Sequence, residues 1–354
     1  MEQLEVKQKQ KLGKERDLSF DVMNILACIS VIALHHNSLV HSFVPTAGWV
    51  QSLVIECLCY FCVPFFMMIS GANLLDYHKK YDTAVFFRKR LTRVVIPWLL
   101  WSVIILLWRV KTAQIEKPAL GEALFLVINT VSSNNKLMPQ YWFFGELFAC
   151  YLAMPVLSKL CDDRKTLWYI ILLCFAFQSV LPLTNRWIGI QWTLDVPVTG
   201  SLILFVLLGY LLSTQELSRK QRIFLYVLGI AGVAFRFAYT LHFSFLKGTT
   251  DTTIKGYRYF HSVFYAVAVF VLGRQISWDR ILPVWLKRKL PAIASCSFGV
   301  YLIHYLVMYY EKLILHIGDN YAVWRIPCIF LTYFICLAIV SGLRKIPVLK
   351  YLVG

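Results

Sequence analysis

The 354-residue chain is 58% hydrophobic and 16% charged, and its formal net charge is +17. Soluble domains are roughly 45–50% apolar and about 25% charged, so this chain has too few polar side chains to cover a soluble surface. Because apolar runs of about 18 residues or more recur along it, the sequence predicts an all-α, polytopic integral membrane protein. Most of the ten cysteines lie inside apolar runs, where free cysteine behaves as a small hydrophobe, and this excludes a secreted disulfide framework.

The hydropathy pattern predicts ten membrane spans in one domain. A basic, hydrophilic segment at residues 1–17 precedes a membrane domain at 18–345, and a tail follows at 346–354. The first apolar run is expected to be a retained helix because no convincing small-residue cleavage site follows it. The predicted spans are 18–40, 50–76, 93–110, 141–158, 167–183, 196–213, 222–245, 259–277, 291–313 and 322–342.

One segment between the third and fourth spans, "PALGEALFLVINTVSSNNKLMPQ", has an apolar part that is too short to cross a bilayer. We expect it to form an interfacial helix and a loop.

The basic residues indicate an orientation. Most of the 36 lysines and arginines fall in the N-terminal segment and in every second connection. This bias predicts that both termini and the basic loops are cytoplasmic. The net charge is then explained by topology and contact with anionic membrane lipid, without a nucleic-acid partner.

Several ionisable residues lie inside predicted spans, where each costs a few kcal/mol on insertion scales and usually faces a cavity or a partner. They are His35, His36, Glu56, Glu146, Arg236, His261 and His304. Each has a structural alternative: Arg236 and His261 can snorkel to an interface, and Glu56 can bond a backbone group.

The pair His35 and His36 cannot face one cavity together, because consecutive helical residues point about 100° apart. One of them is expected to work chemically while the other packs or forms hydrogen bonds. From the start of the first span, about 15 residues at 1.5 Å each place His35 past the bilayer midplane. A neutral imidazole there can accept a proton from a hydroxyl or carry an acyl group.

Arg90 and Arg93 lie three residues apart at the start of the third span, which predicts two guanidiniums on one helix face. Such a pair suits phosphate groups. Positive-inside anchoring explains the same residues equally well.

Five motifs in chain order resemble the acyltransferase 3 family of membrane O-acyltransferases that modify bacterial surface glycans. In "FDVMNILACISVIALHH", Asp21, Ala27, Val31 and His35 fit the first-helix pattern. The other four are "VPFFMMISGANLL", "FRKRLTRVVIPWL", "YWFFGELFACYLAMPVL" and "SFGVYLIHYLV". One departure is Asn24, which stands where the family typically carries an arginine. Either Arg16 or another cation substitutes for it, or the acyl donor is held differently.

The resemblance implies a multi-pass protein of the cell membrane that moves an acyl group, most simply acetyl from cytoplasmic acetyl-CoA. The acceptor is a sugar hydroxyl on a cell-surface or lipid-linked glycan, and no metal is expected. The chain ends just after its tenth span, as in stand-alone members. The implied roles are catalysis by His35 with Glu56 or Glu146 as a partner, donor binding by Arg90, Arg93, Asn24, Arg16 and Ser70, and acceptor binding by His36, Trp142, Tyr301 and His304.

The alternative function is a transporter or flippase for a glycan or lipid-linked sugar, which ten spans with buried polar groups would also suit. Transporters often show two halves with matching interrupted helices. This sequence has no such internal symmetry, so the ordered motifs favour the transferase.

Overall fold

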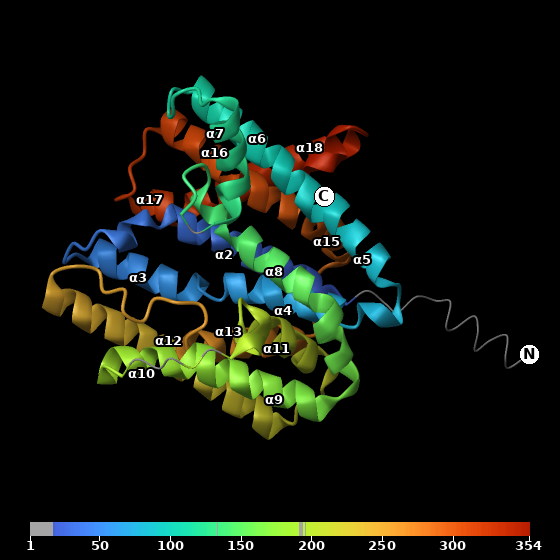
Figure 1. Ribbon diagram of the computed structural model, residues 1–354. Helices are drawn as coiled ribbons and strands as arrows, with labels where there is room; N and C mark the ends of the chain where they lie inside the picture. Colours follow the sequence, from blue (N-terminus) through green and yellow to red (C-terminus); the bar gives the residue numbers. More distant parts are fainter. Residues whose placement is uncertain (1–16, 133, 191–193, 195) are drawn as a thin grey trace, which may run out of the picture.

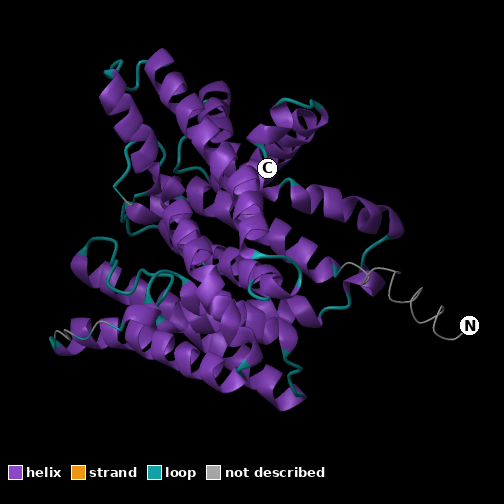
Figure 2. Ribbon diagram, turned by 45° about the vertical axis from the view of Figure 1, so that its right-hand side comes forward, coloured by secondary structure: helices purple, strands orange, loops and turns teal. Residues whose placement is uncertain are grey.

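The computed structural model describes residues 17–132, 134–190, 194 and 196–354. Arg16, one of the expected donor-binding residues, and nearly all of the segment 1–17 therefore lie outside the described residues. The described chain is 79% helical. Figure 2 shows it as helices and loops, with no strand among the described residues. The predicted all-α class is confirmed.

The first half of the chain forms long helices, several of them continued by a short 3₁₀ or π segment. Their bounds are α2 Leu18–His36, α3 Ala47–Cys59, α4 Cys62–Leu74, α5 Thr83–Arg90, α6 Ile96–Lys111, α7 Leu120–Ile128, α8 Trp142–Leu157, α9 Arg164–Cys174 and α10 Leu181–Ile188. Helix α7 occupies the segment that was too short to span.

The second half contains one very long helix, α12, and shorter ones around it. The bounds are α11 Ile203–Thr214, α12 Arg219–Lys247, α13 Phe260–Gln275, α14 Trp278–Ile281, α15 Val284–Ser295, α16 Ser297–Leu315, α17 Ala322–Arg325 and α18 Pro327–Lys345.

Seven helices in the described part of the chain are long and apolar enough to cross a membrane, and α15 with α16, bent by 69°, make an eighth candidate. These match eight of the ten predicted spans. The remaining two, 196–213 and 259–277, correspond to α11 with 12 residues and α13 with 16. At 1.5 Å per residue, α11 covers only about 18 Å, which is less than the roughly 30 Å hydrocarbon core.

Helix α2 occupies the centre of the bundle, with contacts to α3, α4, α13, α15, α16 and α18. In the view of Figure 1, α9, α10 and α12 lie on one side of the central helices, and α6, α7 and α16 lie on the other. The side chain of Asp17 caps α2 by accepting a hydrogen bond from the backbone N–H of Ser19 at 3.0 Å. At the other end, Asn37 donates from its side-chain amide to the carbonyl of Ser52 at 2.7 Å, which ties α2 to α3.

Glycines set the close approach of α4 and α11. A Cβ on Gly71 would lie 1.9 Å from the carbonyl oxygen of Val206, and one on Gly209 would lie 2.0 Å from that of Met68. No side chain fits in such gaps, so the two backbones pack directly on each other. Small residues at helix interfaces serve this purpose in membrane proteins, where no hydrophobic force brings helices together.

The basic connections gather at one end of the bundle. Arg274 pairs with Asp17, Lys79 pairs with Asp162 at 2.7 Å, and Arg164 donates to the carbonyl of Thr214. The contacts at the other end are of a different kind, for example Lys255 with His41 at 3.1 Å and Arg325 with Gln51 at 2.9 Å.

The C-terminal segment predicted as a tail packs on the bundle. Val353 is fully buried, and Trp101 of α6 donates from its indole nitrogen to the carbonyl of Leu352 at 2.7 Å.

Candidate active site

A cavity of about 310 Å³ opens at the end of α2, between α2, α3, α4, the start of α8, α16 and the segment 248–259. Four residues that the sequence proposed for the site line it, namely His35, Glu56, Trp142 and Tyr301. The other polar and aromatic residues in its wall are Asn37, His41, Tyr60, Gln140, Phe143, Lys255 and Tyr257.

His35 is half-buried in this cavity, and neither of its ring nitrogens has a hydrogen-bond partner among the described residues. Its ring lies 5.2 Å from the ring of His304 and 6.3 Å from that of Tyr305, measured between centroids. An imidazole that is exposed to a cavity and uncommitted to protein partners is free to bond a ligand.

His304 is fully buried behind His35 and is not part of the cavity wall. Its Nδ1 lies 2.6 Å from the carbonyl oxygen of Tyr301, which can only accept, so Nδ1 carries the proton. The Nε2 atom of His304 has no partner among the described residues and keeps its lone pair. The structure thus places His304 beside the expected catalytic group, whereas the sequence proposed it for the acceptor.

His36 points away from the cavity, as expected for one member of the pair. It is fully buried, with Nδ1 2.9 Å from the carbonyl oxygen of Trp324 and Nε2 2.8 Å from the hydroxyl of Thr332. Because both nitrogens are occupied, His36 is not placed to contact a substrate. It fixes the rotation of α2 and so turns His35 into the cavity.

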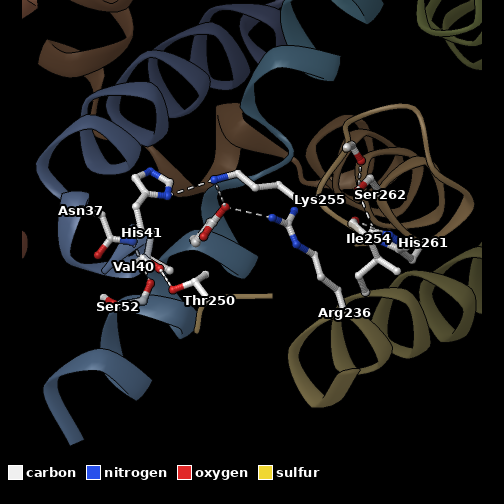
Figure 3. Close-up of polar contacts among 12 residues, drawn as sticks. Asn37, Val40, His41, Ser52, Arg236, Thr250, Ile254, Lys255, His261 and Ser262 are labelled. Carbon is white, nitrogen blue, oxygen red and sulfur yellow. Dashed lines mark hydrogen bonds and ion pairs between the residues drawn. The ribbon is translucent and has the colours of Figure 1, made fainter. Parts of the chain in front are cut away.

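Glu56 reaches the cavity but is held by cations, not by His35. Its Oε1 lies 3.1 Å from Arg236 and 3.3 Å from Lys255, and the Lys255 ammonium is also 3.1 Å from Nδ1 of His41 (Figure 3). Arg236, 5% exposed, lies with its guanidinium carbon 3.3 Å from the centroid of the Tyr60 ring. The expected orientation of His35 by Glu56 is therefore not seen, because both cations compete for that carboxylate.

Glu146 lines a different cavity and accepts a hydrogen bond from Ser201 at 2.5 Å. Trp142, which lines both cavities, stacks on Tyr257 with centroids 5.8 Å apart and planes at 20°. Tyr301 donates from its hydroxyl to the carbonyl of Gln140 at 2.5 Å. Trp142 and Tyr301 are thus placed to shape the cavity wall, and Glu146 is not brought to His35.

Sequence reasoning missed two amides in the wall. Asn37 is fully buried and its Oδ1 has no partner among the described residues; Gln140 is 3% exposed and neither its amide nitrogen nor its amide oxygen has one. Buried polar groups are rarely left unpaired, so these atoms are placed to bond a ligand. The sequence signal was weak: each residue is a lone amide at the edge of an apolar run.

The expected donor-binding residues lie apart from His35. Arg90 is half-buried, 5.7 Å from the ring of Tyr151, in a separate cavity that does not include the exposed Arg93. A π-helical turn at Leu91–Val95 follows Arg90 and contains Arg93. Such turns often occur at functional sites. The two arginines do not line one cavity.

The last two expected donor-binding residues are tied into the bundle. Asn24 donates from its amide to the carbonyl of Ala294 at 3.3 Å, across from α2 to α15. Ser70 is half-buried on α4, next to the close packing at Gly71. Neither lines the cavity at His35.

The fold and this site define a multi-pass membrane protein with a histidine facing an internal cavity. The family model described as an acyltransferase domain, that of the acyltransferase 3 family, matches residues 17–341. The chain belongs to this family and is a membrane acyltransferase. Searches of curated proteins and of solved structures returned no match.

Proposed function

We propose that this protein transfers an acetyl group from acetyl-CoA to a sugar hydroxyl of a cell-surface or lipid-linked glycan in the cell membrane. The observation that carries the proposal is His35, whose uncommitted imidazole faces a cavity bordered by the unpaired amide oxygen of Asn37 and the unpaired amide of Gln140. A carbohydrate site usually contains amides that pair with sugar hydroxyls. It also contains aromatic side chains that pack against the apolar faces of the sugar ring.

In the proposed reaction His35 acts as general base. It takes the proton of the acceptor hydroxyl while the hydroxyl oxygen attacks the thioester carbonyl of the donor. The new carbon–oxygen bond forms, the carbon–sulfur bond breaks, and the proton passes from His35 to the leaving thiolate of coenzyme A. His304, whose Nδ1–H is held by the Tyr301 carbonyl, supports the ring of His35 from behind.

The donor would enter from the basic end of the bundle, where Arg90 and Arg93 would meet its phosphates. A guanidinium matches phosphate geometry, and Arg90 is half-buried beside Tyr151. The coenzyme would then extend along the bundle toward His35, since Arg90 and the imidazole line separate cavities.

The test is binding and turnover of acetyl-CoA by the purified protein, with calorimetry and release of free coenzyme A as readouts. His35→Ala is expected to bind the donor and release no coenzyme A. Arg90→Ala/Arg93→Ala is expected to bind it at least about tenfold more weakly, which is a loss of 1.4 kcal/mol.

Matched controls exist for both variants. His242→Ala removes an exposed histidine from α12, and Arg219→Ala/Arg222→Ala removes two arginines with the same spacing at the start of that helix. Both controls should behave as wild type. If wild type shows no affinity for acetyl-CoA, the proposal is wrong and transport of a glycan becomes the leading function.

A further inference from the structure

A second cavity, about 710 Å³ in volume, adjoins the one at His35. The two share four wall residues, Tyr60, Trp142, Lys255 and Tyr257. None of the proposed steps of acyl transfer uses the second cavity, although Glu146 lines it. Because these four residues line both, the second cavity is a direct neighbour of the reacting position.

The shared wall is a stack of three aromatic rings. The rings of Tyr60 and Tyr257 lie 4.1 Å apart at 15°, and those of Tyr257 and Trp142 lie 5.8 Å apart at 20°. Aromatic faces in ligand sites hold flat apolar surfaces, and the C–H face of a pyranose ring is such a surface. Tyr257 is covered on both faces by the other two rings, and Arg236 covers the far face of Tyr60. The packing surface that the stack offers to a sugar ring is therefore the outer face of Trp142, which lines both cavities.

The second cavity also contains an unpaired buried amide. Gln178 is 7% exposed, and neither its amide nitrogen nor its amide oxygen has a hydrogen-bond partner among the described residues. It lies in a π-helical turn, Phe175–Val180, at the junction of α9 and α10. An unsatisfied buried amide costs free energy unless a ligand pairs with it, and one amide can donate to one sugar hydroxyl while accepting from another.

The two cavities thus repeat one arrangement. Each combines a buried, unpaired glutamine, Gln140 or Gln178, with the same three aromatic rings in its wall. The second has the charged groups Glu146 and Arg258 in its wall, and Lys255 is common to both cavities. A single sugar bound at His35 would leave Gln178 unpaired.

We infer that the second cavity is an acceptor subsite that holds the sugar next to the one that is acylated. The acceptor is then an oligosaccharide segment of at least two sugars and not a free monosaccharide. This inference rests on the proposed function, because it takes the first cavity as the reacting position.

The experiment measures release of coenzyme A from acetyl-CoA by the full-length protein in nanodiscs, with two series of saccharides. One series is glucose, cellobiose and cellotriose; the other is N-acetylglucosamine with its β-1,4-linked dimer and trimer. At least one disaccharide is expected to exceed its monosaccharide by about tenfold or more in kcat/KM, with little further gain from the trisaccharide.

The decisive variant is Gln178→Met, which removes the amide and keeps the length of the side chain. Since the amide has no protein partner, this change is not expected to lower the melting temperature. It should cut the advantage of the disaccharide by about tenfold through KM and leave monosaccharide turnover unchanged. Glu146→Gln should also lower the ratio of kcat/KM for the disaccharide to kcat/KM for the monosaccharide. Gln140→Met, in the first cavity, should weaken both acceptors equally.

Three outcomes overturn the inference: equal use of monosaccharides and disaccharides by wild type, an equal loss for both in Gln178→Met, or no stimulation by any saccharide. Slow release of coenzyme A in the absence of any saccharide is measured as well. It distinguishes failure of the subsite inference from failure of the proposed function. If that slow release persists and depends on His35, the transferase stands and only the subsite is rejected.

Discussion

Nε2 of His36 lies 2.8 Å from the hydroxyl oxygen of Thr332, and this contact decides where the protons of a buried network lie. Nδ1 of His36 faces a carbonyl and must donate. The Thr332 hydroxyl also contacts Glu311 but has only one proton, so it cannot donate to both neighbours. A neutral His36 therefore requires a protonated Glu311, and an ionised Glu311 requires an imidazolium.

We expect the neutral arrangement, because all three side chains are buried and separated charges in such a place are costly. An infrared spectrum of wild type should then contain the carbonyl stretch of a protonated carboxylic acid that is absent from Glu311→Gln. If Glu311→Gln instead lacks a carboxylate band that wild type has, Glu311 is ionised and the charged arrangement is present.

Thr332→Val should destabilise the protein by about 1–3 kcal/mol, because it leaves His36 and Glu311 buried without their shared partner. Thermal unfolding in detergent measures this. The control is Thr184→Val on α10, where the hydroxyl only bonds the carbonyl of Leu181 in its own helix. Similar melting temperatures for the two variants would argue against a structural role for the network.

Glu56→Gln should cost about 3–5 kcal/mol, since it leaves Arg236 buried without its carboxylate. The double variant Glu56→Gln/Arg236→Met should recover much of the loss, because it removes the stranded charge as well. Asp76→Asn breaks an exposed pair with Lys80 and should cost no more than about 1 kcal/mol. Additive effects of the two substitutions at Glu56 and Arg236 would show that the pair is not coupled.

Gly71→Ala and Gly209→Ala should each strongly destabilise the bundle, because the new methyl group would overlap a backbone carbonyl of the facing helix. Overpacking of this kind usually costs about 1–3 kcal/mol or more. Gly342→Ala on α18 has no atom within 4 Å of its new Cβ and should be neutral or slightly stabilising. Thermal unfolding in detergent measures the three melting temperatures. Equal values for all three variants would contradict this expectation.

The segment 248–259, which carries Lys255 and Tyr257, should loosen in acid. Burial alone would raise the pKa of Asp251, but hydrogen bonds from Lys247 and Thr253 outweigh it and hold that pKa below its usual value of 3.8. A lowered carboxyl pKa contributes stability that is complete above the unfolded pKa and is lost as the pH falls through the folded pKa. Proteolysis within 248–259 should therefore rise only below about pH 4.

Asp251→Asn should make this segment sensitive to protease already at neutral pH and remove most of the acid dependence. Asp279→Asn, at an exposed position, is the matched control and should change neither. If the segment of Asp251→Asn is as sensitive to acid as that of wild type, a group other than Asp251 causes the sensitivity.

Much of the architecture was readable from the sequence, because long apolar runs and clustered basic residues are local signals. The runs alone predicted the all-α membrane class. They also predicted the seven helices of the described chain that are long enough to span a membrane, and the bent pair of α15 and α16 as an eighth span. They overestimated the lengths of α11, which begins at Ile203 and has 12 residues, and of α13, which has 16. The adjacent pair of histidines also predicted correctly that only one could face a cavity.

What the sequence by itself determined was the family pattern and the position of His35 at the end of the first helix. Only the tertiary structure decided that Glu56 serves Arg236 and Lys255, that Glu146 lines a second cavity, and that buried amides border both. The physical reason is that such pairings join residues far apart in the chain, such as Glu56 and Arg236, through the rotation and crossing of packed helices. No local spacing encodes those contacts.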